Sequence, residues 1–144
     1  MLEAMKMAKL AYDNDEVPVG AIIVKNEKII GRGFNEVITQ NSVSSHAEIN
    51  AINQASKFTN NYRLNGCDIY VTLEPCHMCA KAIVDARIDK IIFATPEPKT
   101  GSLISIDNIL DRLDFNHKVS YQHGLFAEES SMLLKNFFKQ RRKN

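Results

Sequence analysis

The sequence predicts an α/β fold that forms a single domain over residues 1–144. Runs of β-branched and other apolar residues alternate along the chain with segments whose apolar residues recur every three or four positions. In the middle of the chain, a strand, a helix and a strand follow one another, an order that implies a parallel pair of strands. The 144 residues contain no repeat, linker or low-complexity tract and suit one hydrophobic core.

The first part of the chain predicts a helix followed by a hairpin. Residues 2–12 have apolar side chains at helical spacing. The apolar runs 19–24 and 29–34 flank the polar turn 25–28, as expected for two antiparallel strands. Polar residues 40–45 then predict a loop.

The central part predicts helices at 46–58 and 76–86, each followed by a strand, at 68–73 and 90–94. A loop rich in proline and glycine comes next, and the remaining elements are a short helix at 106–112, a strand at 119–123 and an amphipathic helix at 127–142. In that last helix, Met132, Leu133 and Phe137 are predicted to face inward, with Leu134 as a further candidate.

Composition narrows the class of protein and its surroundings. The 44% hydrophobic and 24% charged residues are ordinary for a globular domain, and no apolar run approaches the roughly 18 residues of a membrane span. The N-terminus does not resemble a secretory signal. Three cysteines, two of them close together, suit a metal site in a reduced compartment better than a disulfide scaffold. We therefore expect a cytoplasmic protein without membrane association.

The net charge of +1 does not identify a partner, but basic residues gather at the C-terminus, where no acidic residue follows Glu129. This tail predicts a local positive patch that suits phosphate groups. A solvated helix surface accounts for the same charges equally well.

Two motifs carry the candidate chemistry: His46-Ala47-Glu48 and Pro75-Cys76-His77-Met78-Cys79. They offer one imidazole and two thiolates as metal ligands, and the i, i+3 spacing puts both sulfurs on one helix face. Three protein ligands leave one tetrahedral position of a zinc ion open for water, the arrangement of catalytic sites. The carboxylate of Glu48 is then available for proton transfer.

Each motif also has a simpler interpretation. Ser45 and Glu48 fit a helix capping box, and Cys-x-x-Cys fits a redox pair or half of a structural zinc site. A structural site needs a fourth protein ligand, and the remaining candidates are Cys67, His77, His117 and His123. Cys67 is expected to be buried, His77 to point away from Cys76, and the other two to lie on the surface. Hydrolytic zinc chemistry is therefore the better account of the two motifs together.

The sequence resembles the bacterial tRNA adenosine deaminases, which convert the wobble adenosine of an arginine tRNA with an ACG anticodon to inosine. The resemblance covers nearly the whole chain and includes both motifs and the segments 16–21, 33–35, 61–64, 70–76, 99–101 and 137–142. Cytidine, deoxycytidylate and guanine deaminases share the zinc signature. Asn-Tyr-Arg-Leu at 61–64 and the Phe-Phe-basic tail at 137–142 narrow the resemblance to the tRNA branch.

This resemblance implies a three-layer α/β/α cytidine deaminase-like fold, with a central mixed sheet of about five strands and helices on both faces. It implies one zinc ion per chain, held by His46, Cys76 and Cys79, with Glu48 as the proton shuttle. Asn35 would hydrogen-bond the adenine ring. The base pocket would be shaped by Val19, Leu73 and the backbone around Ala47 and Glu74.

The resemblance also implies a homodimer that binds the tRNA anticodon stem-loop. The implied RNA contacts are Glu97, Lys99, Phe138, Lys139, Arg141 and Arg142. The chain departs from the family at Glu97, where aspartate is usual, and prolines flank it at 96 and 98. Two alternative functions remain at this point: a zinc deaminase of a free base or nucleotide, of guanine or cytosine type, and a zinc-stabilised RNA-binding module without catalysis.

Overall fold

The computed structural model describes residues 1–112 and 114–143, and its centre is one five-stranded sheet in the order β2-β1-β3-β4-β5. The strands are β1 (Gly20–Lys25), β2 (Lys28–Phe34), β3 (Cys67–Leu73), β4 (Lys90–Thr95) and β5 (Ser120–His123). The α-helices are α1 (Leu2–Asp13), α2 (Ala47–Thr59), α3 (His77–Asp85) and α4 (Ala127–Lys143). Each of these bounds lies within two residues of the range that periodicity predicts.

The sheet is mixed, as predicted. Strand β1 pairs antiparallel with both β2 and β3, whereas β3, β4 and β5 run parallel. Helix α3 connects β3 to β4 and so makes the predicted parallel crossover. The carboxyl ends of β3 and β4 therefore lie at the same edge of the sheet, where the motif Pro75–Cys79 begins.

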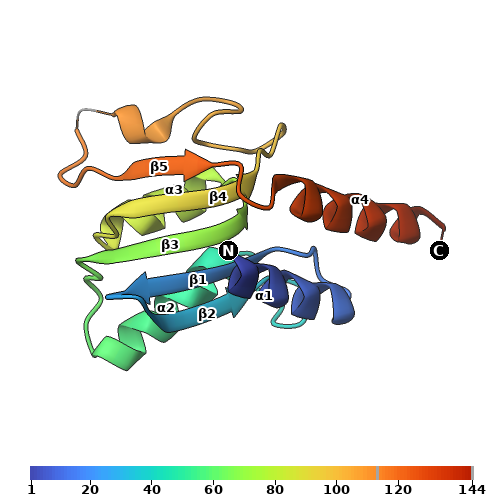
Figure 1. Ribbon diagram of the computed structural model, residues 1–144, viewed down its shortest axis with the longest axis horizontal. Coiled ribbons are helices and arrows are strands. Elements are labelled where there is room, and N and C mark those ends of the chain that lie inside the picture. The colour runs from blue at the N-terminus through green and yellow to red at the C-terminus, as the bar shows by residue number, and fades with distance from the viewer. Residues whose placement is uncertain (113, 144) are drawn as a thin grey trace.

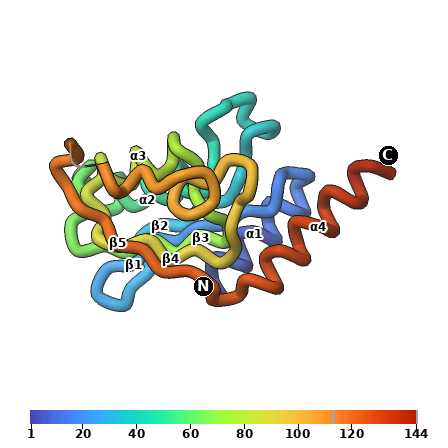
Figure 2. The backbone as a smooth tube through the Cα atoms, turned by 90° about the horizontal axis from the view of Figure 1, so that it is seen from above, coloured from blue at the N-terminus to red at the C-terminus, as the bar shows by residue number. Residues whose placement is uncertain are grey.

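Helices cover both faces of the sheet, which gives the expected three layers (Figures 1 and 2). Helices α2 and α3 lie on one face, while α1 and α4 lie on the other and touch through Tyr12 and Phe137, whose ring centroids are 5.9 Å apart. Gly33 in β2 allows the start of α2 to lie very close to the sheet, because a Cβ there would stand 2.3 Å from the carbonyl oxygen of Ala47. This close contact fixes the end of α2 that carries the first motif.

Two details of the predicted elements were wrong. The helix expected at 106–112 is a single 3-10 turn, Ile109–Asp111. In α4, Met132 is exposed rather than inward; Leu133 and Leu134 are both half-buried, and of the two it is Leu134 that packs against the core. The side of α4 that meets the rest of the fold carries Ser130, Leu134 and Phe137, which recur at helical spacing, and the Ser130 hydroxyl donates to the Thr72 carbonyl.

Among the described residues, no helix combines the length and the apolar character needed to span a membrane.

Candidate active site

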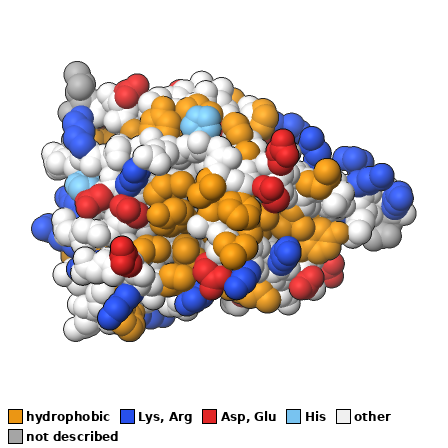
Figure 3. Space-filling view, viewed as in Figure 1, with side chains coloured by type: hydrophobic (Ala, Val, Ile, Leu, Met, Phe, Trp, Pro, Cys, Tyr) orange, Lys and Arg blue, Asp and Glu red, His pale blue; other side chains and the backbone are white. Residues whose placement is uncertain are grey.

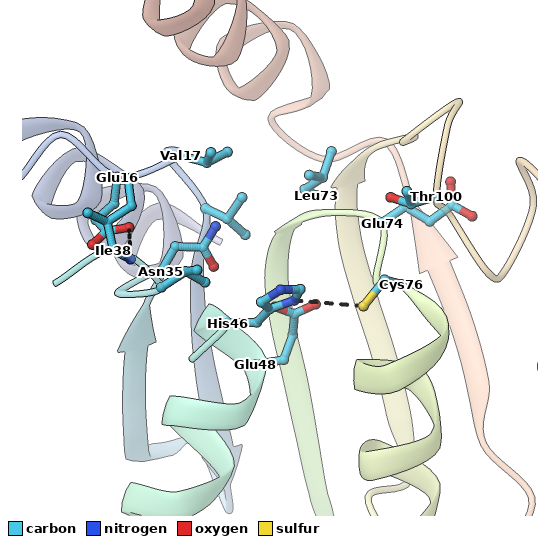
Figure 4. Close-up of a pocket in the computed structure, with 12 residues that line it drawn as sticks. Glu16, Val17, Asn35, Ile38, His46, Glu48, Leu73, Glu74, Cys76 and Thr100 are labelled. Carbon is cyan, nitrogen blue, oxygen red and sulfur yellow. Dashed lines mark hydrogen bonds between the residues drawn. The ribbon is translucent and has the colours of Figure 1, made fainter. Parts of the chain in front are cut away.

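Three side chains from two helix starts come together at the edge of the sheet. His46 is the N-cap of α2, Cys76 is the N-cap of α3, and Cys79 lies in the first turn of α3. The His46 Nδ1 atom lies 3.7 Å from Cys76 Sγ and 3.4 Å from Cys79 Sγ, and all three ligand atoms fall within 4.8 Å of one another. Figure 4 shows His46 and Cys76 facing each other from the two helices.

The two distances from His46 to the sulfur atoms fit a tetrahedral zinc ion. Bonds of about 2.3 Å to sulfur and 2.0 Å to nitrogen place the ligand atoms roughly 3.5–3.8 Å apart. Within residues 1–112 and 114–143, no fourth histidine, cysteine or carboxylate joins the group. The set therefore matches a catalytic zinc site, which keeps one position open, better than a closed structural one.

The electrostatics of the trio also suit a cation. Hydrogen bonds from Cys79 and His46 lower the pKa of the Cys76 thiol to about 4, which favours the thiolate form that binds metal. The hydrogen bond to Cys76 raises the pKa of His46, and the same contact with Cys76, together with burial, raises that of Cys79. Two thiols and an imidazole this close together compete for protons, and a divalent cation bound among them would favour the deprotonated ligand forms.

Glu48 lies beside the trio, in the first turn of α2, with only 4% of its surface exposed (Figure 4). Burial raises the pKa of Glu48 to about 7, which lets this carboxyl gain and lose a proton near neutral pH. The capping-box interpretation of Glu48 is wrong: the Ser45 N–H donates to the Ser42 carbonyl, and the Ser45 hydroxyl pairs with Asn50. The Glu48 carboxylate is therefore available for proton transfer.

A cavity of about 300 Å³ opens over these groups. Of the predicted pocket residues, Val19, Asn35, Leu73 and Glu74 line it together with His46, Glu48 and Cys76. Ala47 does not line it: its side chain is buried, and its N–H donates to Asn35 Oδ1 at 2.8 Å. Because only the amide oxygen can accept that bond, the Asn35 NH₂ group is left to donate into the cavity.

The side chain of Glu74 has a different task from the backbone role expected for this residue. Its carboxylate accepts hydrogen bonds from the N–H groups of Glu97, Leu103, Ile104 and Ser105 and from the Ser105 hydroxyl. Burial raises the pKa of Glu74, but these donors outweigh it and lower the pKa overall. Gly101 passes directly over the carboxylate, since a Cβ there would lie 2.3 Å from it. Glu74 thereby fixes the loop 96–105 against the active site.

A second hollow, of about 860 Å³, continues from the first and shares Leu73 with it. Five of the six predicted RNA contacts line this groove: Glu97, Lys99, Phe138, Arg141 and Arg142, which come from loop 96–105 and from α4. Lys139 is exposed but lies outside the groove lining. Lys and Arg side chains cover the part of α4 that projects from the body of the protein (Figure 3).

The other candidate ligands stand apart from the metal trio. His77 Nε2 lies 2.8 Å from Asp107 Oδ1, and His117 Nε2 bonds the Ile88 carbonyl. His123 stacks on Phe93 with ring centroids 4.9 Å apart, and Cys67 is buried. None of these four can therefore complete a structural site around His46.

Sequence reasoning missed five residues that line the cavity: Glu16, Val17, Val37, Ile38 and Thr100. Glu16 and Val17 stand in a segment that the resemblance contains, but no residue pattern marks them as pocket residues. Val37 and Ile38 belong to the loop between Asn35 and His46. Their place between two site residues is the signal that could have revealed them.

Comparison with known proteins agrees with this fold and site. The model of the MafB19-like deaminase family matches residues 1–142. The tRNA-specific adenosine deaminase of Aquifex aeolicus is 45% identical over 141 residues, which cover 98% of this chain and 93% of that protein. The tRNA-specific adenosine deaminase of Bacillus subtilis is 41% identical over 143 residues, with 99% and 89% covered.

Solved structures give the same result. One from a study of A-to-I editing by tRNA:A34 deaminases superposes with a TM-score of 0.90 at 38% identity, covering 93% of this chain and 97% of the other. The guanine deaminase of Nitrosomonas europaea superposes with a TM-score of 0.76 at 18% identity, covering 93% and 80%, and shares the fold. The fold and the His-Cys-Cys site define a zinc deaminase of the cytidine deaminase-like class. Within that class, the chain belongs to the MafB19-like deaminases and, more closely, to the tRNA-specific adenosine deaminases.

Proposed function

We propose that this protein hydrolyses the wobble adenosine of a tRNA to inosine, with an arginine tRNA bearing an ACG anticodon as its substrate. The observation that carries the proposal is the cavity in which Glu48 and two members of the His-Cys-Cys trio, His46 and Cys76, line the same walls as Asn35. The Aquifex and Bacillus relatives, named as tRNA-specific adenosine deaminases, supply the substrate class. The reaction consumes water and releases ammonia.

In this proposal His46, Cys76 and Cys79 hold the zinc ion. A bound zinc ion supplies Lewis-acid activation of a water molecule, which lets that water lose a proton near neutral pH. Glu48 takes this proton and delivers it to purine N1 while the water oxygen bonds to C6. Glu48 then takes the remaining proton from the new C6 hydroxyl and passes it to the exocyclic amine, so that the C6–N6 bond breaks, the C6 carbonyl of inosine forms and ammonia leaves. A carboxyl with a pKa of about 7 is suited to both transfers.

Asn35 orients the base in this scheme. Its oxygen is held by the Ala47 N–H, so its NH₂ group faces the cavity in one fixed direction and can donate to a ring nitrogen of adenine. Val19 and Leu73 supply apolar walls on either side. An adenine base in an anticodon loop is already unpaired, which makes its entry into such a pocket less costly than from a duplex.

The groove beside the cavity is proposed to hold the nucleotides next to the target. Lys99, Arg141 and Arg142 line it and suit phosphate groups, while Phe138, 44% exposed, offers a face for base stacking. Glu97 differs: its carboxylate accepts the Lys99 N–H at 3.0 Å, and it presents a negative charge to the groove. We propose that Glu97 acts by holding the turn that carries Lys99.

We further propose a cytoplasmic homodimer. Met78, Ile104 and Ile106 expose 39%, 39% and 55% of their surfaces around the start of α3, and a second copy would cover such residues. Light scattering at micromolar concentration tests this part: a mass of two chains supports it, and a single-chain mass at every concentration contradicts it.

Nucleoside mass spectrometry of the arginine tRNA tests the reaction itself. Wild-type protein should form inosine at the wobble position, and Glu48→Gln should abolish turnover while keeping zinc and fold. A protein that deaminates free guanine or cytosine but leaves the tRNA unchanged would be a small-molecule deaminase. Zinc-loaded protein that binds the tRNA without turnover would be a binding module.

A further inference from the structure

Glu16 is a buried carboxylate that the proposed reaction does not use. It is 1% exposed and stands between α1 and β1, at the wall of the active-site cavity. Its Oε1 accepts the Ile38 N–H at 3.1 Å, and its Oε2 accepts the Thr39 N–H at 2.6 Å and the Thr39 hydroxyl at 2.7 Å. Figure 4 shows Glu16 and Ile38 joined by one of these bonds beside Asn35.

The three donors belong to the loop 36–45, which runs directly from Asn35 to His46. The neck of the loop is closed by the Glu36 N–H, which donates to the Ser45 carbonyl at 2.9 Å. Val37 and Ile38 extend from the loop into the cavity wall. The loop therefore joins the residue proposed to read the base to a residue proposed to hold the metal, and Glu16 holds its outer part.

We infer that Glu16 is a positioning residue for the base pocket: it fixes the loop 36–45 so that Val37 and Ile38 form a wall against the target nucleoside. The inference rests on the proposed function, since the occupant of the pocket is taken to be an adenosine in RNA. Glu16 acts through the loop and does not touch the reacting atoms.

The charges around Glu16 suit this role. Burial raises its pKa, but the hydrogen bonds from Thr39 and Ile38 outweigh burial and lower the pKa overall, so the carboxylate is negative at neutral pH. Arg141 of α4 adds a favourable charge, and its Nη2 donates to the neighbouring Asp15 carbonyl at 2.6 Å. The segment that carries Glu16 is thus tied both to the loop and to the helix that lines the RNA groove.

The test compares Glu16→Gln, Thr39→Val and the double variant with wild type, each loaded with zinc. In Glu16→Gln, the new amide has the shape of the carboxylate but only one acceptor atom, so it cannot receive all three bonds. Thr39→Val removes the hydroxyl bond alone. Glu27→Gln, an exposed change in the turn between β1 and β2, is the control for the loss of one negative charge.

We expect Glu16→Gln to lower kcat/KM for an anticodon stem-loop roughly tenfold to hundredfold, mainly through KM, because a misplaced wall misaligns the base. Thr39→Val should lower it by a smaller factor, and the double variant should be no worse than Glu16→Gln because both act through one contact. Hydrogen exchange at the Ile38 and Thr39 amides should accelerate, while the Ala80 amide in α3 stays protected. Glu27→Gln should match wild type.

Unchanged KM in folded, zinc-loaded Glu16→Gln would overturn the inference, and so would a loss of activity that only follows loss of zinc or of thermal stability. If Glu16→Gln does not fold, Thr39→Val decides, and wild-type kcat/KM in that variant overturns the inference. Wild-type protein that makes no inosine refutes the proposed function instead. In that case unchanged exchange at Ile38 and Thr39 in the variants would still overturn the positioning role.

Discussion

Replacing Glu74 with glutamine should loosen the loop 96–105 without unfolding the protein. The Oε2 atom of Glu74 accepts three backbone N–H groups, from Leu103, Ile104 and Ser105, at 2.8–3.1 Å. The Oε1 atom accepts the Glu97 N–H and the Ser105 hydroxyl. A glutamine whose oxygen takes the Oε2 position keeps the first three bonds but turns an NH₂ group toward the Glu97 N–H. The hydroxyl can rotate and accept, whereas the Glu97 N–H cannot.

The size of the effect follows from the Glu97 N–H, the donor that loses its acceptor in the variant. A partly buried N–H without an acceptor costs about 1–3 kcal/mol. If the penalty falls on loop opening, the open state becomes roughly 5- to 150-fold more populated. The three remaining bonds also lose the strengthening that a charged acceptor gives. The lower end of this range is therefore the smallest increase in the open-loop population that Glu74→Gln should cause.

Amide hydrogen exchange measures this directly. In Glu74→Gln, the amides of Leu103, Ile104 and Ser105 should exchange at least about fivefold faster than in wild type. Glu97→Gln is the matched control, because among the described residues the Glu97 carboxylate accepts one hydrogen bond, from the nearby Lys99 N–H in an exposed turn. Exchange rates in Glu74→Gln within about twofold of wild type, well below that fivefold minimum, would refute the reasoning.

Three further predictions test the packing, the charges and the groove. Phe137→Ala should lower the free energy of unfolding by about 3–5 kcal/mol, because Phe137 is 5% exposed and packs on Tyr12. Phe138→Ala should change the free energy of unfolding little. Equal effects of the two variants in urea denaturation would contradict the inward position of Phe137. The pKa of Glu16 is lowered in the folded state from its ordinary value of 4.5, so wild type should be more stable than Glu16→Gln. This stability difference should be complete above pH 4.5 and disappear as the pH falls through the folded-state pKa. Urea titrations at several pH values measure the difference, and a difference that grows in acid would contradict the prediction. Arg142→Ala should weaken stem-loop binding and reduce the slope of the logarithm of the binding constant against the logarithm of salt concentration by about 0.7. An unchanged slope would show that Arg142 does not contact a phosphate group.

Hydrophobic periodicity and ligand spacing were enough to predict most of the fold and the metal trio. The five strands and four α-helices lie within two residues of their predicted ranges, because the helices and most strands carry apolar runs or apolar faces; β5 (Ser120–His123), which is mostly polar and exposed, is the exception. His46, Cys76 and Cys79 could be grouped since the order of elements brings two helix starts to one edge of the sheet.

The rest depends on polar contacts between distant segments, which periodicity does not contain. Asn35 holds the Ala47 N–H, and Glu16 and Glu74 each hold a loop more than twenty residues away in the chain. Such residues are visible only when the segments that they join are in place.

The most direct measurement of the central claim is the inosine content of an ACG-anticodon arginine tRNA after incubation with protein of known zinc content. The account predicts inosine at the wobble position with wild type at about one zinc ion per chain, and none with zinc-loaded Glu48→Gln. Wild-type protein that holds zinc but leaves the adenosine intact would contradict the account, and so would a Glu48→Gln variant that deaminates it at the wild-type rate.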